Sequence, residues 1–170
     1  MKSILFLSLF FCSTAFSDEL KVGDPAPLFK AKNQAGKDFD LKAQKGKWTV
    51  LFFYPKAETP GCTKEVCAFR DGIKKIEAQG AKVFGISADT VEAQAGFHRH
   101  HNLNFPLLAD PEAKVIQLYG SMMEGKNLSR RWTFLIDKKL MVRSIEKNVD
   151  PLLDAERVAK EISTLKKETK

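Results

Sequence analysis

Short apolar runs recur along the chain and alternate with segments of helical periodicity. WTVLFFY (48–54), AKVFGIS (81–87) and WTFLI (132–136) are apolar almost throughout. Such runs are typical of strands that are buried on both faces. LMVRSI (140–145) is expected to pair with the third run through a turn at 137–139.

Helical patterns fall between these runs. After Cys62, an apolar stripe at helical spacing predicts a helix whose buried face contains Val66, Phe69, Ile73 and Ile76. A weaker helical segment is expected from Thr90 to His101. These helices separate the apolar runs, as in a chain that alternates strands and helices.

Prolines and glycines indicate where further elements begin and turn. Asp110-Pro111 and Asp150-Pro151 are each interpreted as an N-cap followed by proline at the first helical position. The first of these helices is expected to close at Gly120, and the second to run to about Leu165. Near the start, LFKAKNQAGKDFDL predicts a small hairpin that turns near Gly36.

This order of elements is that of an α/β protein with a central mixed sheet flanked by helices. Sites in such sheets form at the carboxyl ends of strands. The loop that follows the run 48–54 leaves the sheet at such an end. We therefore expect the functional chemistry in the segment YPKAETPGCTKEVCAFRD (54–71).

The first seventeen residues have the pattern of a secretory signal peptide. A basic start at Lys2 precedes an apolar run from Ile4 to Phe11, and Ala15 and Ser17 occupy the small-residue positions before the expected cleavage. The run is shorter than the roughly 20 residues of a membrane-spanning helix, so we expect no stable membrane insertion. The sequence thus predicts a protein exported to the periplasm, with residues 18–170 as its one domain, and an uncleaved anchor as the alternative.

The charge of the chain argues for a solvated surface. The formal net charge is +7, and removal of residues 1–17 takes away Lys2 and no acid, which leaves +6. The basic residues are scattered, several alternate with acids, and they form no basic stripe with interleaved aromatics. This pattern argues against nucleic-acid binding.

The two cysteines that remain after cleavage are Cys62 and Cys67. An oxidising compartment favours a structural disulfide between them on composition alone. On an ideal helix, however, residues five apart have Cα atoms roughly 8 to 9 Å apart. A disulfide needs about 4.4 to 6.8 Å, so this bond cannot form until the first helical turn unwinds. That geometry favours a resolving cysteine over a structural crosslink.

Cys62 has the surroundings of an activated nucleophile. A cysteine thiol at its reference pKa of about 8.5 is only about 3% ionised at pH 7, so a thiolate needs stabilisation. Cys62 is expected in the first helical turn, where free N–H groups and the helix dipole favour an anion. Arg131, just before the run 132–136, is the candidate cation.

Three neighbours of Cys62 could support this chemistry. The Thr59 hydroxyl could hold a substrate oxygen. Pro55 would fix the backbone of the loop and help to shield the site from water. Glu65 lies one helical turn after Cys62 and could hold Arg131 by a paired hydrogen bond.

The histidines His98, His100 and His101 raise the question of a metal site. His98 and His101 share a helix face, but no carboxylate or cysteine stands near them at a suitable spacing in the sequence. We therefore interpret them as part of a solvated polar face, and we expect no metal site.

The segment 54–71 resembles the active-site segment of the peroxiredoxins, specifically the bacterioferritin-comigratory-protein or Q-type subfamily. The matching residues are Pro55, Thr59 and Cys62 in the pattern Pro-x-x-x-Thr-x-x-Cys, Cys67 in the Cys-x-x-x-x-Cys form, and Arg131 before the Thr-Phe-Leu-Ile-Asp strand. The stretches 22–29, 85–90 and 104–112 are also similar to the family, and the match covers nearly all of 20–165.

The resemblance implies a thioredoxin-like fold and thiol-dependent reduction of peroxides, without a metal or an organic cofactor. Cys62 would attack the peroxide and become a sulfenic acid, and Cys67 would condense with it to a disulfide. Thr59 and Arg131 would orient the peroxide and stabilise the developing charge. A thioredoxin-like dithiol in the same compartment would reduce the disulfide, and the protein would be a monomer or a weak homodimer.

Two residues depart from the subfamily's pattern. Trp132 stands where a small residue is expected, and it would narrow the pocket or shift its opening. Arg130 adds a second cation of unknown direction beside Arg131.

Two other functions compete with a peroxidase. A thioredoxin-type protein disulfide oxidoreductase would have Cys-x-x-Cys, whereas this chain has four residues between its cysteines. A non-catalytic binding domain with a structural disulfide would give no reason for the spacing of Pro55, Thr59 and Cys62, or for Arg131.

Overall fold

The computed structural model describes residues 19–168, which form one seven-stranded mixed sheet with helices on both faces. The elements in chain order are β1 (Lys30–Asn33), β2 (Asp38–Asp40), the 3-10 helix η1 (Leu41–Gln44), β3 (Trp48–Phe53), α1 (Pro60–Glu77), β4 (Ala81–Ser87), α2 (Val91–His100), β5 (Leu107–Ala109), α3 (Lys114–Leu118), β6 (Trp132–Ile136), β7 (Val142–Glu146) and α4 (Asp154–Glu168). The strand order is β2-β1-β5-β4-β3-β6-β7. β3 pairs in parallel with β4, and β4 with β5, while the remaining pairs are antiparallel.

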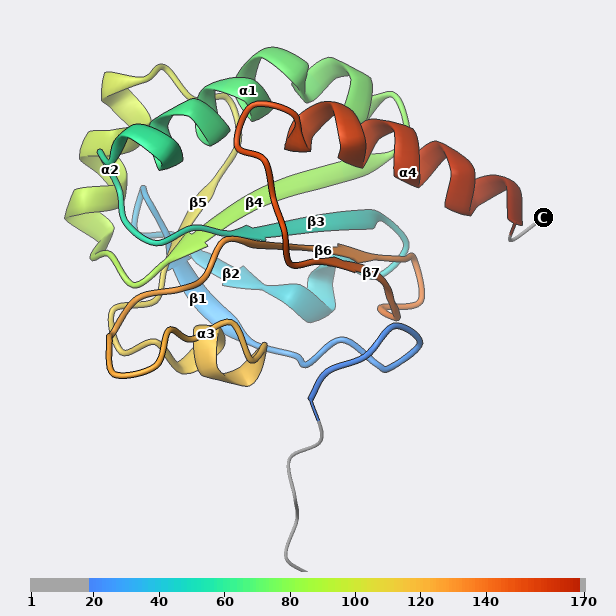
Figure 1. Cartoon of the computed structure of the whole chain (residues 1–170), viewed down its shortest axis with the longest axis horizontal. Coiled ribbons are helices and arrows are strands. Elements are labelled where there is room, and N and C mark those ends of the chain that lie inside the picture. The colour runs from blue at the N-terminus through green and yellow to red at the C-terminus, as the bar shows by residue number, and fades with distance from the viewer. Residues whose placement is uncertain (1–18, 169–170) are drawn as a thin grey trace, which may run out of the picture.

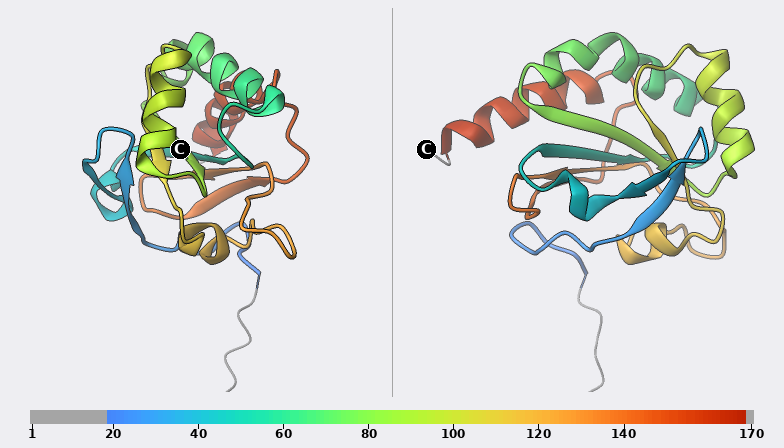
Figure 2. Two further views of the ribbon diagram at one scale, coloured as in Figure 1. Left: turned by 90° about the vertical axis from the view of Figure 1, so that its left-hand side faces the viewer. Right: turned by 180° about the vertical axis from the view of Figure 1, so that it is seen from behind.

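The helices divide between the two faces of the sheet. α1 and α4 lie side by side over one face, and the short α3 lies under the other (Figure 1). The views from the side and from behind in Figure 2 show the same three layers. At one close point between α1 and α4, a Cβ built on Gly72 would lie 3.3 Å from the Cβ of Ala155.

Alternation along β3 builds a separate core on each face. Val50, Phe52 and Tyr54 point to the face under α1 and α4, whereas Leu51 and Phe53 point to the face with α3. All five side chains are fully buried, which explains why this stretch of sequence is apolar without a break.

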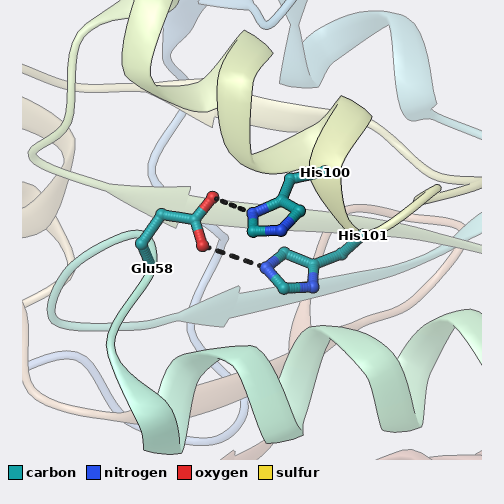
Figure 3. A group of neighbouring side chains, drawn as sticks. All are labelled: Glu58, His100 and His101. Atoms are coloured by element: carbon teal, nitrogen blue, oxygen red, sulfur yellow. Dashed lines mark hydrogen bonds and ion pairs between the residues drawn. The ribbon is translucent and has the colours of Figure 1, made fainter.

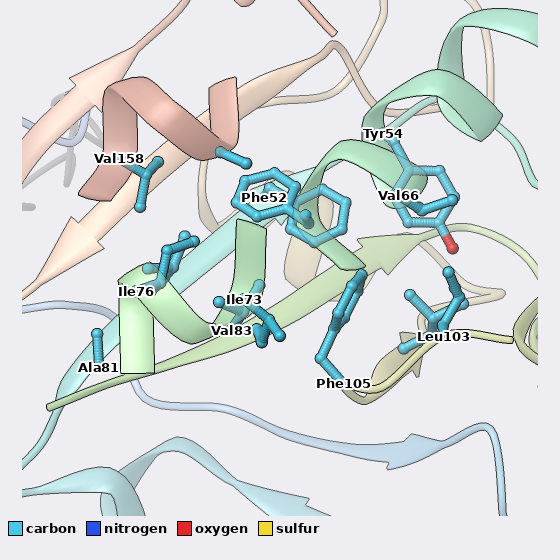
Figure 4. Close-up of a cluster of buried hydrophobic side chains, with 14 of the residues drawn as sticks. Phe52, Tyr54, Val66, Ile73, Ile76, Ala81, Val83, Leu103, Phe105 and Val158 are labelled. Atoms are coloured by element: carbon cyan, nitrogen blue, oxygen red, sulfur yellow. The ribbon is translucent and has the colours of Figure 1, made fainter. Parts of the chain in front are cut away.

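The core under α1 and α4 centres on Phe52, whose position Figure 4 shows. Its ring stacks on Phe69 of α1 at a centroid distance of 4.4 Å and meets the edge of Phe105 at 5.7 Å. Gly85 of β4 makes room for it, since a Cβ there would lie 2.6 Å from Phe52 Cζ. The predicted apolar stripe of α1 faces this core, because Val66, Phe69, Ile73 and Ile76 are all buried.

The predicted strands and the first two helices are confirmed to within about two residues at each end. The hairpin also forms, between β1 and β2, with Gly36 at a φ of 71° that favours glycine. The three-residue strand β5 was not predicted, because Leu107–Ala109 is too short to show a periodicity of its own.

The predicted starts of the last two helices are wrong. The pairs Asp110-Pro111 and Asp150-Pro151 open turns, and α3 and α4 begin at Lys114 and Asp154. Ala113 has a φ of 51° and separates the first turn from α3. Both aspartates still serve the backbone that follows them. Asp110 Oδ2 accepts the N–H of Ile116 at 2.9 Å, and Asp150 Oδ1 accepts the N–H of Leu152 at 2.9 Å. Gly120 ends the helical stretch at a φ of 68°, as predicted.

The predicted signal peptide, residues 1–17, lies outside the described residues. Within 19–168, none of the helices combines the length and the apolar character that crossing a membrane would require.

Candidate active site

The site is built at the first turn of α1, directly after the loop that leaves β3. Thr59 is the N-cap of α1 in an extended conformation, and Pro60 is the first helical residue, where its fixed φ suits a helix start. Cys62 is therefore the third residue of the helix, within the turn whose N–H groups have no intrahelical acceptor. Its side chain is fully buried, and its thiol is free.

Sheet pairing brings Arg131 to this cysteine from far along the chain. β6 pairs antiparallel with β3, with Trp132 opposite Phe53, so that Arg131 lies beside the start of the site loop. Arg131 Nη2 donates a hydrogen bond to Cys62 Sγ at 3.4 Å. Cys62 Sγ therefore lies between a guanidinium and the N-terminus of α1, the kind of surroundings in which reactive cysteines are found.

Glu65 holds the same guanidinium from one turn further along α1. Arg131 Nη1 donates to Glu65 Oε2, and the Glu65 side chain is fully buried. Burial raises the pKa of Glu65 to about 8, the nearby Asp154 adds to the rise, and Arg131 opposes it. Glu65 Oε1 has no hydrogen-bond partner within the described part of the chain. Arg131 therefore has one hydrogen bond to the carboxyl and one to the sulfur.

The loop between β3 and α1 is tied down by hydrogen bonds to β4 and its continuation. The N–H of Ala57 donates to Asp89 Oδ2 at 2.8 Å, and Ser87 Oγ donates to the same oxygen at 2.7 Å. Tyr54 OH donates to Gln94 Oε1 of α2 in the buried region below the loop. These contacts set the path of the loop before it reaches Thr59.

Thr59 and Pro55 border the site from this loop. Thr59 is half-buried, and its Oγ1 donates to the carbonyl oxygen of Lys56 at 2.8 Å. Because that bond uses the hydroxyl proton, the lone pairs of Oγ1 can accept from a second group. Pro55 is half-buried directly after Tyr54.

Gly61 is a site residue that the sequence reasoning did not single out. A Cβ on Gly61 would lie 3.1 Å from Arg131 Nη2, which is tighter than an ordinary contact. A residue without a side chain here lets the guanidinium approach the helix start. The only signal in the sequence is that this glycine stands between Pro60 and Cys62.

Cys67 lies on the same unbroken helix as Cys62. Its thiol is free and half-buried against the core under α1 and α4. Since α1 runs continuously from Pro60 to Glu77, the ideal helical separation applies, and a bond between the two sulfurs requires local opening of this helix.

Trp132 and Arg130 lie away from Cys62. Trp132 is buried in the core on the opposite face of the sheet, so the expectation that it narrows the pocket is wrong. The reason is strand alternation, since neighbouring residues in an extended segment point to opposite faces. Arg130 has its Cζ 5.8 Å from the centroid of the Trp132 ring, which gives the direction that the sequence left open.

The histidines are also placed differently from the prediction. The structure brings Glu58 of the site loop to His100 and His101, so the inference that no carboxylate stands near them is wrong. The partner is 42 residues away in sequence from His100, which local spacing could not reveal. His98 is half-buried and is not part of this group.

Comparison with known proteins independently shows which family the chain resembles. Residues 22–145 match the AhpC/TSA family. The putative peroxiredoxin bcp of Coxiella burnetii is 38% identical over 132 residues, which cover 74% of this chain and 87% of that protein. The chloroplastic peroxiredoxin Q of Triticum aestivum is 44% identical over 128 residues, and the match spans 74% of this chain and 58% of the wheat protein.

Solved structures give the same fold. Peroxidoxin BcpB from Mycobacterium tuberculosis superposes with a TM-score of 0.80 and 33% identity, over 86% of this chain and 98% of that one. A variant of PrxQ from Xylella fastidiosa gives a TM-score of 0.82 and 25% identity, over 86% of this chain and 97% of that one. The architecture described above is therefore the thioredoxin-like fold of the peroxiredoxins.

Proposed function

We propose that this chain, which belongs to the AhpC/TSA family and is a peroxiredoxin of the bacterioferritin-comigratory-protein and Q type, reduces hydrogen peroxide and organic hydroperoxides through Cys62. Peroxiredoxins are thiol-dependent peroxidases. The observation that carries this proposal is the hydrogen bond from Arg131 Nη2 to Cys62 Sγ at 3.4 Å, at the N-terminus of α1. A sulfur in such surroundings is suited to act as a nucleophile.

In the first step, the Cys62 thiolate attacks one peroxide oxygen. A sulfur–oxygen bond forms, the oxygen–oxygen bond breaks, and the leaving oxygen takes a proton to become water or an alcohol. Negative charge moves from the sulfur toward the leaving oxygen during this step. Arg131 is placed to stabilise that charge, and the Thr59 oxygen can accept a hydrogen bond from the peroxide O–H.

In the second step, the Cys67 thiol condenses with the sulfenic acid of Cys62. A disulfide forms and water leaves, so the two thiols together supply both electrons for the peroxide. The step needs the first turns of α1 to open, because both cysteines lie on the intact helix. An external dithiol of the thioredoxin type would then reduce the disulfide and allow the helix to close.

We further propose that the protein works outside the cytoplasm as a monomer or a weak homodimer, after cleavage following Ser17. The support for export and cleavage is the pattern of residues 1–17 in the sequence. N-terminal sequencing of the protein recovered from an expressing cell tests this, with Asp18 as the expected first residue. Recovery of the chain with Met1 in the cytoplasmic fraction would contradict it.

Mass spectrometry after one equivalent of hydrogen peroxide tests the peroxidase mechanism. The wild type should form an intramolecular Cys62–Cys67 disulfide, and Cys67→Ser should accumulate sulfenic acid at Cys62 that a dimedone probe traps. Cys62→Ser should consume no peroxide above the buffer blank. Peroxide consumption that persists in Cys62→Ser would refute the role of Cys62, and a disulfide-free Cys62 sulfenic acid in the wild type would refute that of Cys67.

A further inference from the structure

A group of three polar side chains lies beside the site loop and is not used by the proposed mechanism. Glu58 comes from the loop before α1, and His100 and His101 come from the end of α2 (Figure 3). Glu58 Oε1 lies 3.2 Å from His100 Nδ1, and Glu58 Oε2 lies 3.0 Å from His101 Nε2. One ligand atom from each residue can be chosen so that all three lie within 4.8 Å of one another.

The backbone makes this convergence possible at the end of α2. Adjacent residues within a helix point about 100° apart and do not face a common partner. His100 is the last residue of α2, whereas His101 is its C-cap with φ −101° and ψ 9°, and Asn102 follows at a φ of 49°. Departure from the helix sets the two imidazole rings side by side, with centroids 4.5 Å apart and planes at 31°.

The loop contributes its carboxylate through an unusual backbone conformation. Glu58 has a φ of 61°, in the left-handed region that residues other than glycine rarely adopt. Such a conformation costs of the order of 1 kcal/mol or more, and surrounding contacts must hold it in place. In Figure 3 the Glu58 side chain reaches toward both rings. The left-handed backbone of Glu58 therefore lets its carboxylate contact both histidines.

Two imidazole nitrogens and one carboxylate oxygen form a donor set for a borderline metal ion. Zinc binds such nitrogens at about 2.0–2.1 Å and carboxylate oxygens at about 2.0–2.2 Å, usually in a tetrahedron. In a tetrahedron of that size, neighbouring donors lie about 3.3–3.5 Å apart. Each Glu58 oxygen already contacts one imidazole nitrogen, at 3.2 and 3.0 Å, and one ligand atom from each residue lies within 4.8 Å of the others. Small shifts of the side chains would therefore bring three donors to this spacing.

We propose that Glu58, His100 and His101 form a binding site for a divalent transition metal ion of the zinc type. The protein supplies three ligands, and the exposure of His100, at 71% of its side chain, leaves a fourth position open to water. The carbonyl end of α2 carries partial negative charge and favours a cation there. The opposing charges are the Arg70 guanidinium, which donates to the His101 carbonyl oxygen at 2.8 Å, and Arg99 in the last turn of α2.

The position of the site ties it to the loop that leads to Cys62. Glu58 directly precedes Thr59, the N-cap of α1, so a bound ion would join this loop to the end of α2. The inference does not rest on the proposed peroxidase function, because metal binding is measured without any redox step. Failure of the metal-site proposal would therefore leave the proposed peroxidase function standing, and failure of the peroxidase function would leave the metal-site proposal standing.

Isothermal titration with zinc chloride tests the site on an untagged chain that carries Cys12→Ser, Cys62→Ser and Cys67→Ser. The three serines exclude binding by thiolates, which are strong zinc ligands. We expect one ion per chain in this parent. Glu58→Gln and His100→Asn should each weaken binding at least tenfold, because each removes one of three ligands. Circular dichroism establishes that the variants are folded, and Glu58→Gln preserves the shape of the side chain.

His98→Asn is the matched control, since His98 lies on the same helix and outside the group. It should bind zinc as the parent does. An absence of one-to-one binding in the parent would overturn the proposal and leave the group as a hydrogen-bonded tether of the loop. Binding by Glu58→Gln as tight as the parent's, or equal losses in His98→Asn and His100→Asn, would also overturn it.

Discussion

Replacement of Arg131 by glutamine tests the central electrostatic claim of the proposed mechanism. The change removes a positive charge whose Nη2 lies 3.4 Å from Cys62 Sγ and keeps a polar side chain. Cys62 is fully buried, and only 19% of the Arg131 side chain is exposed. The local medium is therefore closer to protein than to bulk water.

The size of the effect follows from this separation. Opposite unit charges this far apart attract by about 5 kcal/mol at an effective dielectric constant of about 20, and by about 1 kcal/mol in bulk water. Each 1.4 kcal/mol or so changes a rate tenfold. If the whole attraction acted in the transition state, its loss would therefore slow the reaction by roughly ten- to three-thousandfold. Part of the attraction also stabilises the thiolate before it reacts. We therefore expect the second-order rate with hydrogen peroxide to fall by about a hundredfold.

The variant should remain folded. It loses the hydrogen bond from the guanidinium to Glu65, which is worth about 1.5 to 3 kcal/mol of unfolding free energy. Loss of the cation also removes the attraction that opposes the raised pKa of Glu65. The pKa of Glu65 then rises further above about 8, so near neutral pH the carboxyl stays protonated and the variant holds no unpaired buried anion.

Stopped-flow measurement of the reduced protein with peroxide gives the rate, and urea unfolding gives the stability. Arg130→Gln is the matched control, because Arg130 lies over Trp132, whose ring packs on the opposite face of the sheet. It should react within about threefold of the wild type. If Arg131→Gln is folded and also reacts within about threefold of the wild type, the electrostatic role of Arg131 is refuted.

Two further predictions concern the neighbours of Arg131. Burial raises the pKa of Glu65 from 4.5 to about 8, so the folded state binds more protons than the unfolded state between these values. The unfolding free energy of the wild type, measured relative to that of Glu65→Gln, should therefore fall by a few kcal/mol at most as the pH rises from about 4.5 to about 8. Urea unfolding of both proteins across this pH range measures the difference, and a flat or rising difference would contradict the prediction. Gly61→Ala places a Cβ 3.1 Å from Arg131 Nη2, and the displaced guanidinium should slow the peroxide reaction by about tenfold in stopped-flow. Gly96→Ala is its control, because a Cβ there meets no atom of residues 19–168 within 4 Å. Equal rates for the two alanine variants would count against the argument.

Local patterns were sufficient for most of the strands and for α1. The runs at β3, β4 and β6 are apolar almost throughout because these strands are covered on both faces, and this property is visible in a short window of sequence. The stripe of α1 and the position of Cys62 in its first turn follow from helical spacing and from the proline before it. Positions near Cys62 and before the run 132–136 indicated Thr59, Glu65 and Arg131, and the resemblance to the peroxiredoxins then supported Thr59 and Arg131.

The failures have physical causes of their own. The proline after Asp110 fits both a helix start and a turn, and the left-handed Ala113 that separates this turn from α3 carries no local signal. Gly61 gives no sign in the sequence that an arginine 70 residues away will pass over it at close range. Such features depend on which backbone segments meet.

The sequence by itself determined the apolar strands, the helix with Cys62 and Cys67, and the kind of chemistry that a cysteine at a helix start can perform. Only the tertiary structure decided the contacts between distant segments. Pairing of β3 with β6 brings Arg131 to Cys62 and sends Trp132 to the other face, and the end of α2 brings His100 to Glu58. Periodicity reports burial along one segment, whereas these contacts depend on the register between strands and on the backbone angles where helices end.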